Sequence, residues 1–89
     1  MSEDAREDEE VPDEFLCPIT REIMLDPVSA ADGHTYERTA IEEWLRAGNG
    51  RSPATNEALG SRVLTPNHAL KRLIARVRDR MSRLRRRLG

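Results

Sequence analysis

The sequence predicts a small α+β domain in which a short β-hairpin and a central helix precede a long C-terminal helix. Its 89 residues give room for one domain. A turn signal, Asp32-Gly33, separates two short extended pieces. Further along the chain, residues 38–47 and 70–88 space their apolar side chains three and four apart, which is the period of a helix that buries one face. Together these features favour one small domain with a hairpin, a central helix and a final helix.

The two ends of the chain carry opposite charge. Residues 1–14 hold eight acids against the single base Arg6, and residues 71–89 hold nine bases against the single acid Asp79. Residues 1–13 contain too little apolar surface to offset the entropy of ordering them, so we expect a disordered acidic tail there. We expect the folded domain to span residues 14–75, and residues 76–89 to form a basic amphipathic extension of the last helix.

The first part of the domain reads as a loop followed by a hairpin. Proline interrupts the apolar run Phe15–Ile19, which favours an extended loop over a helix. The hairpin pairs Pro27–Ala30 with Thr35–Glu37 around the Asp32-Gly33 turn. This part of the chain is therefore expected to be mostly irregular, with one small β-element.

The central helix is predicted over residues 38–47. Ile41, Trp44 and Leu45 lie on one face of it, and Gly48 follows where a helix stop is expected. Residues 48–66 read as a long loop with a short strand at residues 62–64. The loop leads directly to the cap of the last helix.

Asn67 is a favourable cap for the last helix. Six apolar residues then recur at alternating spacings of four and three: Leu70, Ile74, Val77, Met81, Leu84 and Leu88. This is a heptad seam flanked by arginines. We expect Leu70, Leu73 and Ile74 to pack on the domain. The rest of the seam would then be free to pair with a second copy of the chain as a homodimer.

The composition excludes several classes of protein. Cys17 is the only cysteine, so no disulfide can form within the chain. With His34 and His68 it makes three soft ligands, whereas a structural zinc site needs four. We therefore expect neither a metal nor a cofactor.

The sequence also limits where the protein can reside and which kinds of partner it can bind. No apolar run approaches the ~20 residues that span a bilayer, and the acidic start does not resemble a secretory signal. We expect a soluble, cytoplasmic protein. The aromatic residues lie away from the arginines, so base stacking is unsupported and a nucleic acid or a membrane is a disfavoured partner.

Six stretches of the chain, in their order and spacing, resemble the U-box family. They are Phe15-Leu16-Cys17-Pro18-Ile19-Thr20, Asp26-Pro27-Val28, Asp32-Gly33-His34-Thr35-Tyr36-Glu37-Arg38, Ile41-Glu42-Glu43-Trp44-Leu45, Ser52-Pro53-Ala54-Thr55-Asn56 and Leu64-Thr65-Pro66-Asn67. The resemblance implies a fold like the RING finger, with its two zinc sites replaced by hydrogen bonds and ion pairs. Candidates for that polar network are Asp26, Asp32, His34, Thr35, Arg38, Thr55 and Asn56.

The resemblance also implies a groove for a ubiquitin-conjugating enzyme. By position it would consist of Ile19, Trp44 and Pro53, with Arg21 at its edge. An aromatic ring, a branched aliphatic chain and a proline lose little side-chain entropy on binding, which suits such an anchor. The helical spacing of Trp44 with Ile41 and Leu45 would, on its own, favour a place in the core.

Asn56 stands where related ligases often carry an arginine. The resemblance implies that this residue donates a hydrogen bond that holds the thioester-linked ubiquitin in a closed conformation. An asparagine amide can donate, with less reach and no charge; the alternative is a plain turn residue. Cys17 lies in an apolar run and is expected to be a buried small hydrophobe rather than a nucleophile.

Two functions follow from these readings. The first is a ubiquitin-protein ligase of the scaffold type, which binds the ubiquitin-conjugating enzyme and its ubiquitin conjugate and promotes transfer to the lysines of an unknown protein substrate. Such a ligase forms no covalent intermediate with ubiquitin. The alternative is a U-box-like binding module with little or no ligase activity, which uses its basic C-terminal helix to bind an anionic partner.

Overall fold

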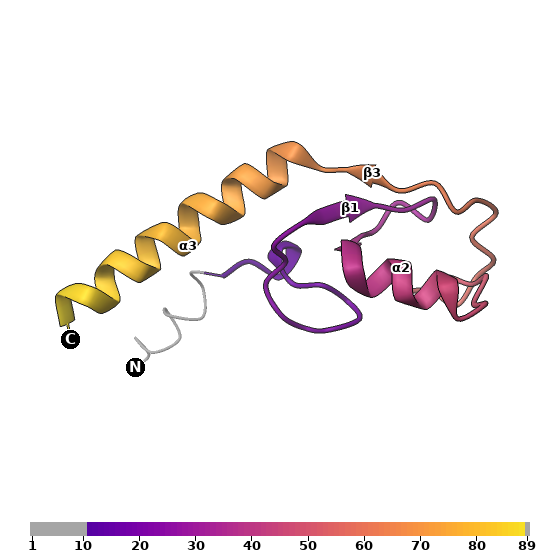
Figure 1. Cartoon of the computed structure of the whole chain (residues 1–89), viewed down its shortest axis with the longest axis horizontal. Coiled ribbons are helices and arrows are strands. Elements are labelled where there is room, and N and C mark those ends of the chain that lie inside the picture. Colours follow the sequence, from indigo (N-terminus) through magenta and orange to yellow (C-terminus); the bar gives the residue numbers. More distant parts are fainter. Residues whose placement is uncertain (1–10, 89) are drawn as a thin grey trace.

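The computed structural model describes residues 11–88 of the chain. Three short strands and a central helix form a compact body, from which a long helix extends (Figure 1). In chain order the elements are η1 (Asp13–Phe15), β1 (Pro27–Ser29), β2 (Thr35–Glu37), α2 (Arg38–Arg46), β3 (Thr65–Pro66) and α3 (His68–Leu88). The predicted α+β class, the hairpin and both helices are confirmed.

The sheet has the order β2-β1-β3, and both strand pairs are antiparallel. Val28 of β1 faces Tyr36 on one side and Pro66 on the other. The strand expected at residues 62–64 is wrong, because the chain is irregular there and pairs with β1 only at Thr65–Pro66. The backbone N–H of Asn67 donates to the carbonyl of Pro27 at 2.9 Å. This bond fixes the chain beside β1 where it enters α3.

One small core joins all the larger elements. Its buried members are Phe15, Cys17, Met24, Val28, Tyr36, Ile41, Leu45 and Ile74. They come from η1, the loop after it, both hairpin strands, α2 and α3. Because each element contributes only one or two side chains, no element can leave the core without exposing the others.

Helix α3 is anchored at its beginning. The Asn67 side-chain oxygen accepts the N–H of Leu70 at 3.1 Å, so the predicted cap is confirmed. Ile74 is 2 % exposed, whereas Leu73 is 45 % exposed. The expected packing of Leu73 is therefore wrong, since one residue turns the side chain about 100° around a helix. Val77 packs against the core instead, one turn further along than expected.

The acidic segment is mostly outside this description. Residues 1–10, and with them most of the predicted tail, lie outside the described residues. Val11 packs against the core, so the packed part includes a residue before the expected boundary at 14. Among the described residues, no helix is both long enough and apolar enough to cross a membrane.

Candidate functional site

The first loop, residues 16–26, is tied to the start of α2 by acceptors on two side chains. The carboxylate of Glu37 accepts the backbone N–H groups of Leu25 at 2.7 Å and Asp26 at 2.9 Å. The sulfur of Cys17 accepts the N–H of Ile19 at 3.4 Å and that of Glu37 at 3.3 Å. These bonds satisfy backbone donors that a short irregular loop cannot pair by itself.

An ion pair completes this first group, which we call the Asp26 cluster (Asp26, Glu37, Arg38 and Lys71). Arg38 Nε lies 2.7 Å from Asp26 Oδ2, and Lys71 Nζ lies 3.8 Å from Asp26 Oδ1. The hydrogen bond from Arg38 is the largest influence on the Asp26 carboxyl and holds its pKa below the usual value. The cluster thus connects the first loop with the beginnings of α2 and α3.

A second group, the Asp32 cluster (Asp32, Tyr36 and Ser52), joins the partly exposed Asp32 to two buried residues, Tyr36 and Ser52. Asp32 Oδ2 accepts the Tyr36 hydroxyl at 2.7 Å and the Ser52 hydroxyl at 2.6 Å, and Asp32 Oδ1 accepts the His34 N–H at 2.9 Å. Burial raises the pKa of the Asp32 carboxyl, but these donors outweigh it, so the net pKa is lowered. Burial, helped by Asp32, raises the pKa of Tyr36 to about 12.

Ser52 shapes the second loop, residues 49–60. Its hydroxyl oxygen accepts the N–H groups of Ala54 at 3.0 Å and Thr55 at 2.9 Å. Its carbonyl accepts the N–H of Asn56 at 2.8 Å, and its own N–H donates to Glu57 at 2.7 Å. Ser52, which is only 2 % exposed, is therefore the residue whose hydrogen bonds hold the second loop together.

The predicted polar network is confirmed for Asp26, Asp32 and Arg38. His34 contributes only its backbone N–H, and the Thr55 hydroxyl accepts a bond from Glu57 at 3.2 Å on the surface. In the described part of the chain, neither cluster includes a bond to the Thr35 or Asn56 side chain.

Sequence reasoning missed five members of the network: Glu37, Lys71, Ser52, Tyr36 and the sulfur of Cys17. A signal existed for Tyr36, because a tyrosine on the inward face of a strand needs a partner for its hydroxyl. The burial expected for Cys17 is confirmed at 0 % exposure. Across residues 11–88, no three His, Cys, Asp or Glu side chains gather as ligands for a metal.

Three of the predicted site residues share an intermediate exposure. Ile19, Trp44 and Pro53 are each half-buried, and the first two also pack against the core. The Trp44 indole N–H donates to the Arg51 carbonyl at 2.8 Å, which joins α2 to the second loop. Ile19 is joined to the start of α2 through Cys17. Trp44 is therefore partly packed on the core and partly exposed to solvent, and its place in a groove for the conjugating enzyme stays a prediction.

The other two predicted residues lie exposed at turns. Arg21 has a φ of 64° and Asn56 a φ of 69°, both in the left-handed region. The N–H of Arg21 donates to the Cys17 carbonyl at 2.7 Å. The carbonyl of Asn56 accepts a bond from Arg51 Nη1 at 2.9 Å. The backbone of Asn56 therefore serves the turn, while its side chain lies on the surface.

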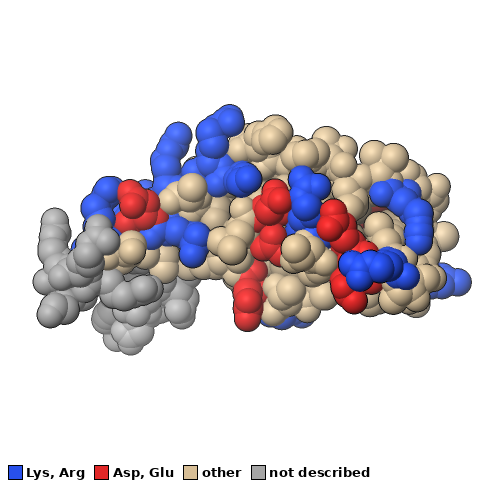
Figure 2. All heavy atoms as spheres, in the orientation of Figure 1, with Lys and Arg blue, Asp and Glu red and all other residues tan. Residues whose placement is uncertain are grey.

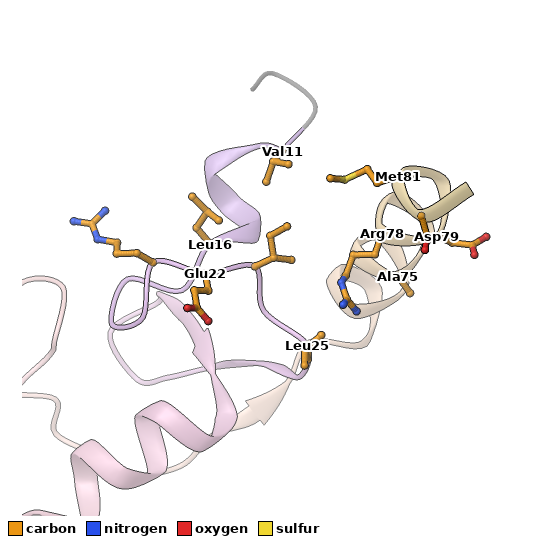
Figure 3. Close-up of a pocket in the computed structure, with 11 residues that line it drawn as sticks. Val11, Leu16, Glu22, Leu25, Ala75, Arg78, Asp79 and Met81 are labelled. Atoms are coloured by element: carbon orange, nitrogen blue, oxygen red, sulfur yellow. The ribbon is translucent and has the colours of Figure 1, made fainter. Parts of the chain in front are cut away.

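A groove of about 920 Å³ separates the first loop from the second half of α3. Apolar side chains including Val11, Leu16 and Leu25 line one wall, and Ala75 and Met81 line the other (Figure 3). Figure 2 shows Lys and Arg side chains along α3 and also over the compact body, where most of the visible Asp and Glu side chains lie between them. Of the predicted site residues, Arg21 lines this groove, whereas Ile19, Trp44, Pro53 and Asn56 do not.

Comparison with known families decides the identity of this fold. The family model of the U-box domain matches residues 11–81, which is most of the chain. The chain belongs to the U-box family. The match covers both polar clusters, α2 and the anchored part of α3, so the U-box grouping rests on the same residues as the geometry above.

Several curated relatives carry this U-box. The WD repeat, SAM and U-box domain-containing protein 1 of Danio rerio is 63 % identical over 65 residues, which are 73 % of this chain and 13 % of that protein. U-box domain-containing protein 13 of Arabidopsis thaliana is 52 % identical over 73 % of this chain and 10 % of its own length. E3 ubiquitin-protein ligase SPL11 of Oryza sativa subsp. japonica is 46 % identical over 73 % of this chain and 9 % of its own length. The chain thus spans about an eighth or less of the length of these relatives.

Proposed function

We propose that this U-box is a ubiquitin-ligase domain of the scaffold type. It binds a ubiquitin-conjugating enzyme and holds its ubiquitin thioester for attack by a lysine of a protein substrate. The observation that carries the proposal is the attachment of both loops to α2, through Cys17 and Glu37 on one side and through Trp44 on the other. Fixed loops suit a domain whose contribution to catalysis is orientation. The printed name of the rice relative, a ubiquitin-protein ligase, supports the same reaction.

The enzyme-binding surface in this proposal consists of Ile19, Trp44 and Pro53, with Arg21 at its edge. Each of the three apolar residues is held by its loop or helix before binding and is half-exposed. Little conformational freedom remains to be lost on association, so a small apolar surface can bind usefully. Trp44 is the central anchor because its ring is already oriented by the Arg51 carbonyl.

Asn56 is the candidate donor to the conjugate. Its side chain lies exposed on the second loop, five residues after Arg51, whose carbonyl orients Trp44. An amide N–H there can donate to the ubiquitin conjugate and stabilise its closed conformation. No residue of the U-box serves as a nucleophile in this scheme, since Cys17 is fully buried and its sulfur accepts two backbone bonds.

The decisive experiment is the discharge of a ubiquitin-charged conjugating enzyme to free lysine, across a panel of such enzymes. The wild-type domain accelerates discharge, and Ile19→Ala or Pro53→Ala abolishes the acceleration while the domain stays folded. Truncating an anchor of this kind costs ~2 kcal/mol or more of binding. Val63→Ala is the matched control, because Val63 is an exposed aliphatic residue outside the proposed surface. If Ile19→Ala is as active as Val63→Ala, the surface is misplaced.

Asn56→Ala separates the donor from the turn. The variant slows discharge but binds the uncharged enzyme as the wild type does, because the proposed bond forms only in the closed conjugate. Asn56→Arg, which restores a longer and charged donor, raises the rate. Equal losses of binding and discharge in Asn56→Ala would make the residue structural.

The finer proposal on partners is a homodimer through α3. Beyond Val77, the seam residues Met81 and Leu84 have no place on the core, and Leu84 is 43 % exposed. A second copy offers the same seam, which makes it the simplest self-complementary partner. The arginines oppose the pairing by repulsion, so the dimer should tighten with salt.

Sedimentation tests the dimer. The chain forms a dimer at high concentration and high salt, and Leu84→Asp makes it monomeric, whereas Arg80→Ala does not. A wild-type chain that stays monomeric under these conditions removes the homodimer. It favours the rival function, in which the exposed arginines of α3 bind an anionic partner (Figure 2). A domain that accelerates no discharge favours the same rival.

A further inference from the structure

Arg51 makes two bonds that reach the two most important members of the proposed site. Its backbone carbonyl accepts the Trp44 indole N–H at 2.8 Å. Its guanidinium donates from Nη1 to the Asn56 carbonyl at 2.9 Å. The residue also pairs with Ala58 in an isolated β-bridge across the second loop. One exposed arginine therefore connects the aromatic anchor of the enzyme surface with the candidate donor to ubiquitin.

The bond from the Arg51 guanidinium supports the turn of the second loop at Asn56. Asn56 has a φ of 69°, in the left-handed region, which asparagine adopts more readily than most residues with a side chain. The Ser52 carbonyl accepts the Asn56 N–H, and Arg51 donates to the Asn56 carbonyl, so both peptide groups of this residue are held. The held backbone fixes the direction in which the Cα–Cβ bond of Asn56 leaves the loop.

We propose that Arg51 is a positioning residue that keeps the Asn56 amide aimed at the ubiquitin conjugate while its carbonyl orients Trp44. The inference rests on the proposed function. The bond to Trp44 uses the backbone of Arg51 and the bond to Asn56 uses its side chain, so a substitution can remove one bond and keep the other. Any residue at position 51 keeps the carbonyl and thus the Trp44 bond, whereas only a long donor keeps the bond to Asn56. Loss of the guanidinium therefore slows transfer from the bound conjugate without weakening the binding of the enzyme.

The test is single-turnover lysine discharge at increasing concentrations of the domain, which separates the maximal rate from the half-saturating concentration. Arg51→Met keeps the length of the side chain and removes its donors. We expect the maximal rate to fall about three- to tenfold, as for one lost hydrogen bond, at an unchanged half-saturating concentration. Arg51→Lys, which keeps one cationic donor, restores part of the rate.

Arg62→Met is the matched control. Arg62 also donates to a backbone carbonyl, that of Leu45 at 2.8 Å, but it is a partner in neither the Trp44 bond nor the Asn56 bond. This variant is expected to discharge at the wild-type rate. It controls for the general loss of an arginine-to-carbonyl bond at the surface of the domain.

A double variant asks whether Arg51 acts through Asn56. If it does, Arg51→Met combined with Asn56→Ala is no slower than Asn56→Ala alone. Additive losses, or a raised half-saturating concentration in Arg51→Met, would overturn the inference and place the guanidinium directly at the enzyme surface. An active wild type with an equally active Arg51→Met also overturns it. A wild type that accelerates no discharge overturns the proposed function itself, and the inference with it.

Discussion

The Asp26 cluster and the Asp32 cluster perform one task, the attachment of a loop to the core, with different chemistry. The Asp26 and Arg38 side chains are 37 % and 33 % exposed, so their ion pair sits in contact with water. Ser52, the centre of the other cluster, is 2 % exposed and bonds to an ionised carboxylate. An exposed pair is screened and replaceable by water, whereas a buried hydrogen bond leaves its partners unpaired when it is lost. The loss of one bond should therefore destabilise the protein more in the second loop than in the first.

The largest effect is expected from Ser52→Ala. It leaves Asp32 without one donor and the Ala54 and Thr55 N–H groups without their acceptor. The free energy of unfolding should fall by about 2–3 kcal/mol, because three hydrogen bonds worth about 1 kcal/mol each are lost together. Urea denaturation measures the change. Ser61→Ala is the control, because its hydroxyl accepts one exposed N–H, that of Val63. Equal losses in the two variants would erase the distinction between buried and exposed bonds.

The Asp32 cluster should make the stability of the protein depend on pH in both the acid and the alkaline range. The folded pKa of Asp32 lies below its ordinary 3.8, so its contribution is present above about pH 4 and is lost as pH falls through the folded pKa. The pKa of Tyr36 is raised from 10.0 to about 12, so its contribution is present below pH 10 and is lost between there and pH 12.

Thermal melts across pH distinguish the groups. Tyr36→Phe should abolish the alkaline loss and keep part of the acid one, because Ser52 and the His34 N–H still donate to Asp32. Asp32→Asn should remove only part of the acid loss, because the lowered pKa of Asp26 contributes in the same direction. If Tyr36→Phe retains the full alkaline loss, the tyrosine is not the group that titrates.

A smaller effect is expected from Arg38→Met. It removes the 2.7 Å bond to Asp26, but water can reach both partners and Lys71 remains near the carboxylate. The melting temperature should fall less than in Ser52→Ala, and the difference from wild type should shrink in high salt. A loss that matches Ser52→Ala and ignores salt would mean that the ion pair behaves as a buried one.

The smallest effect, none, is expected from metal removal. The polar atoms of both clusters, and the sulfur of Cys17, bond to neighbouring protein groups, so we expect each loop to close without an ion. Incubation with a chelator should leave the melting temperature unchanged, and elemental analysis should show no stoichiometric zinc. Unfolding by the chelator would show that a metal, and not the hydrogen bonds, closes one of the loops.

Local signals predicted most of the fold. The Asn67 cap, the Asp32-Gly33 turn and the heptad spacing of α3 each depend on neighbours within one turn or one hairpin. The position of β3 could not be read in this way, because it depends on a bond between Asn67 and Pro27, far apart in the sequence. Leu73 was misplaced because heptad spacing marks an apolar stripe without saying which of its edges meets the core.

The site was predicted less completely than the fold. Family likeness placed Ile19, Trp44, Pro53 and Asn56, and the structure gives each a defined exposure without testing its role. Glu37 and Ser52 were missed because their bonds span 11 and 20 residues, and such bonds follow no period in the sequence. Arg51 was missed for a related reason, since its importance comes from two contacts and not from its residue type.

The sulfur of Cys17 gives the domain an internal reporter. It is the only thiol in the sequence, is fully buried, and touches backbone N–H groups in both the first loop and the start of α2. A thiol-reactive dye can reach it only after these segments separate. The dye's rate of attachment therefore counts rare openings in the native ensemble. Comparing that rate with global unfolding would show whether the first loop opens alone or only when the whole core comes apart.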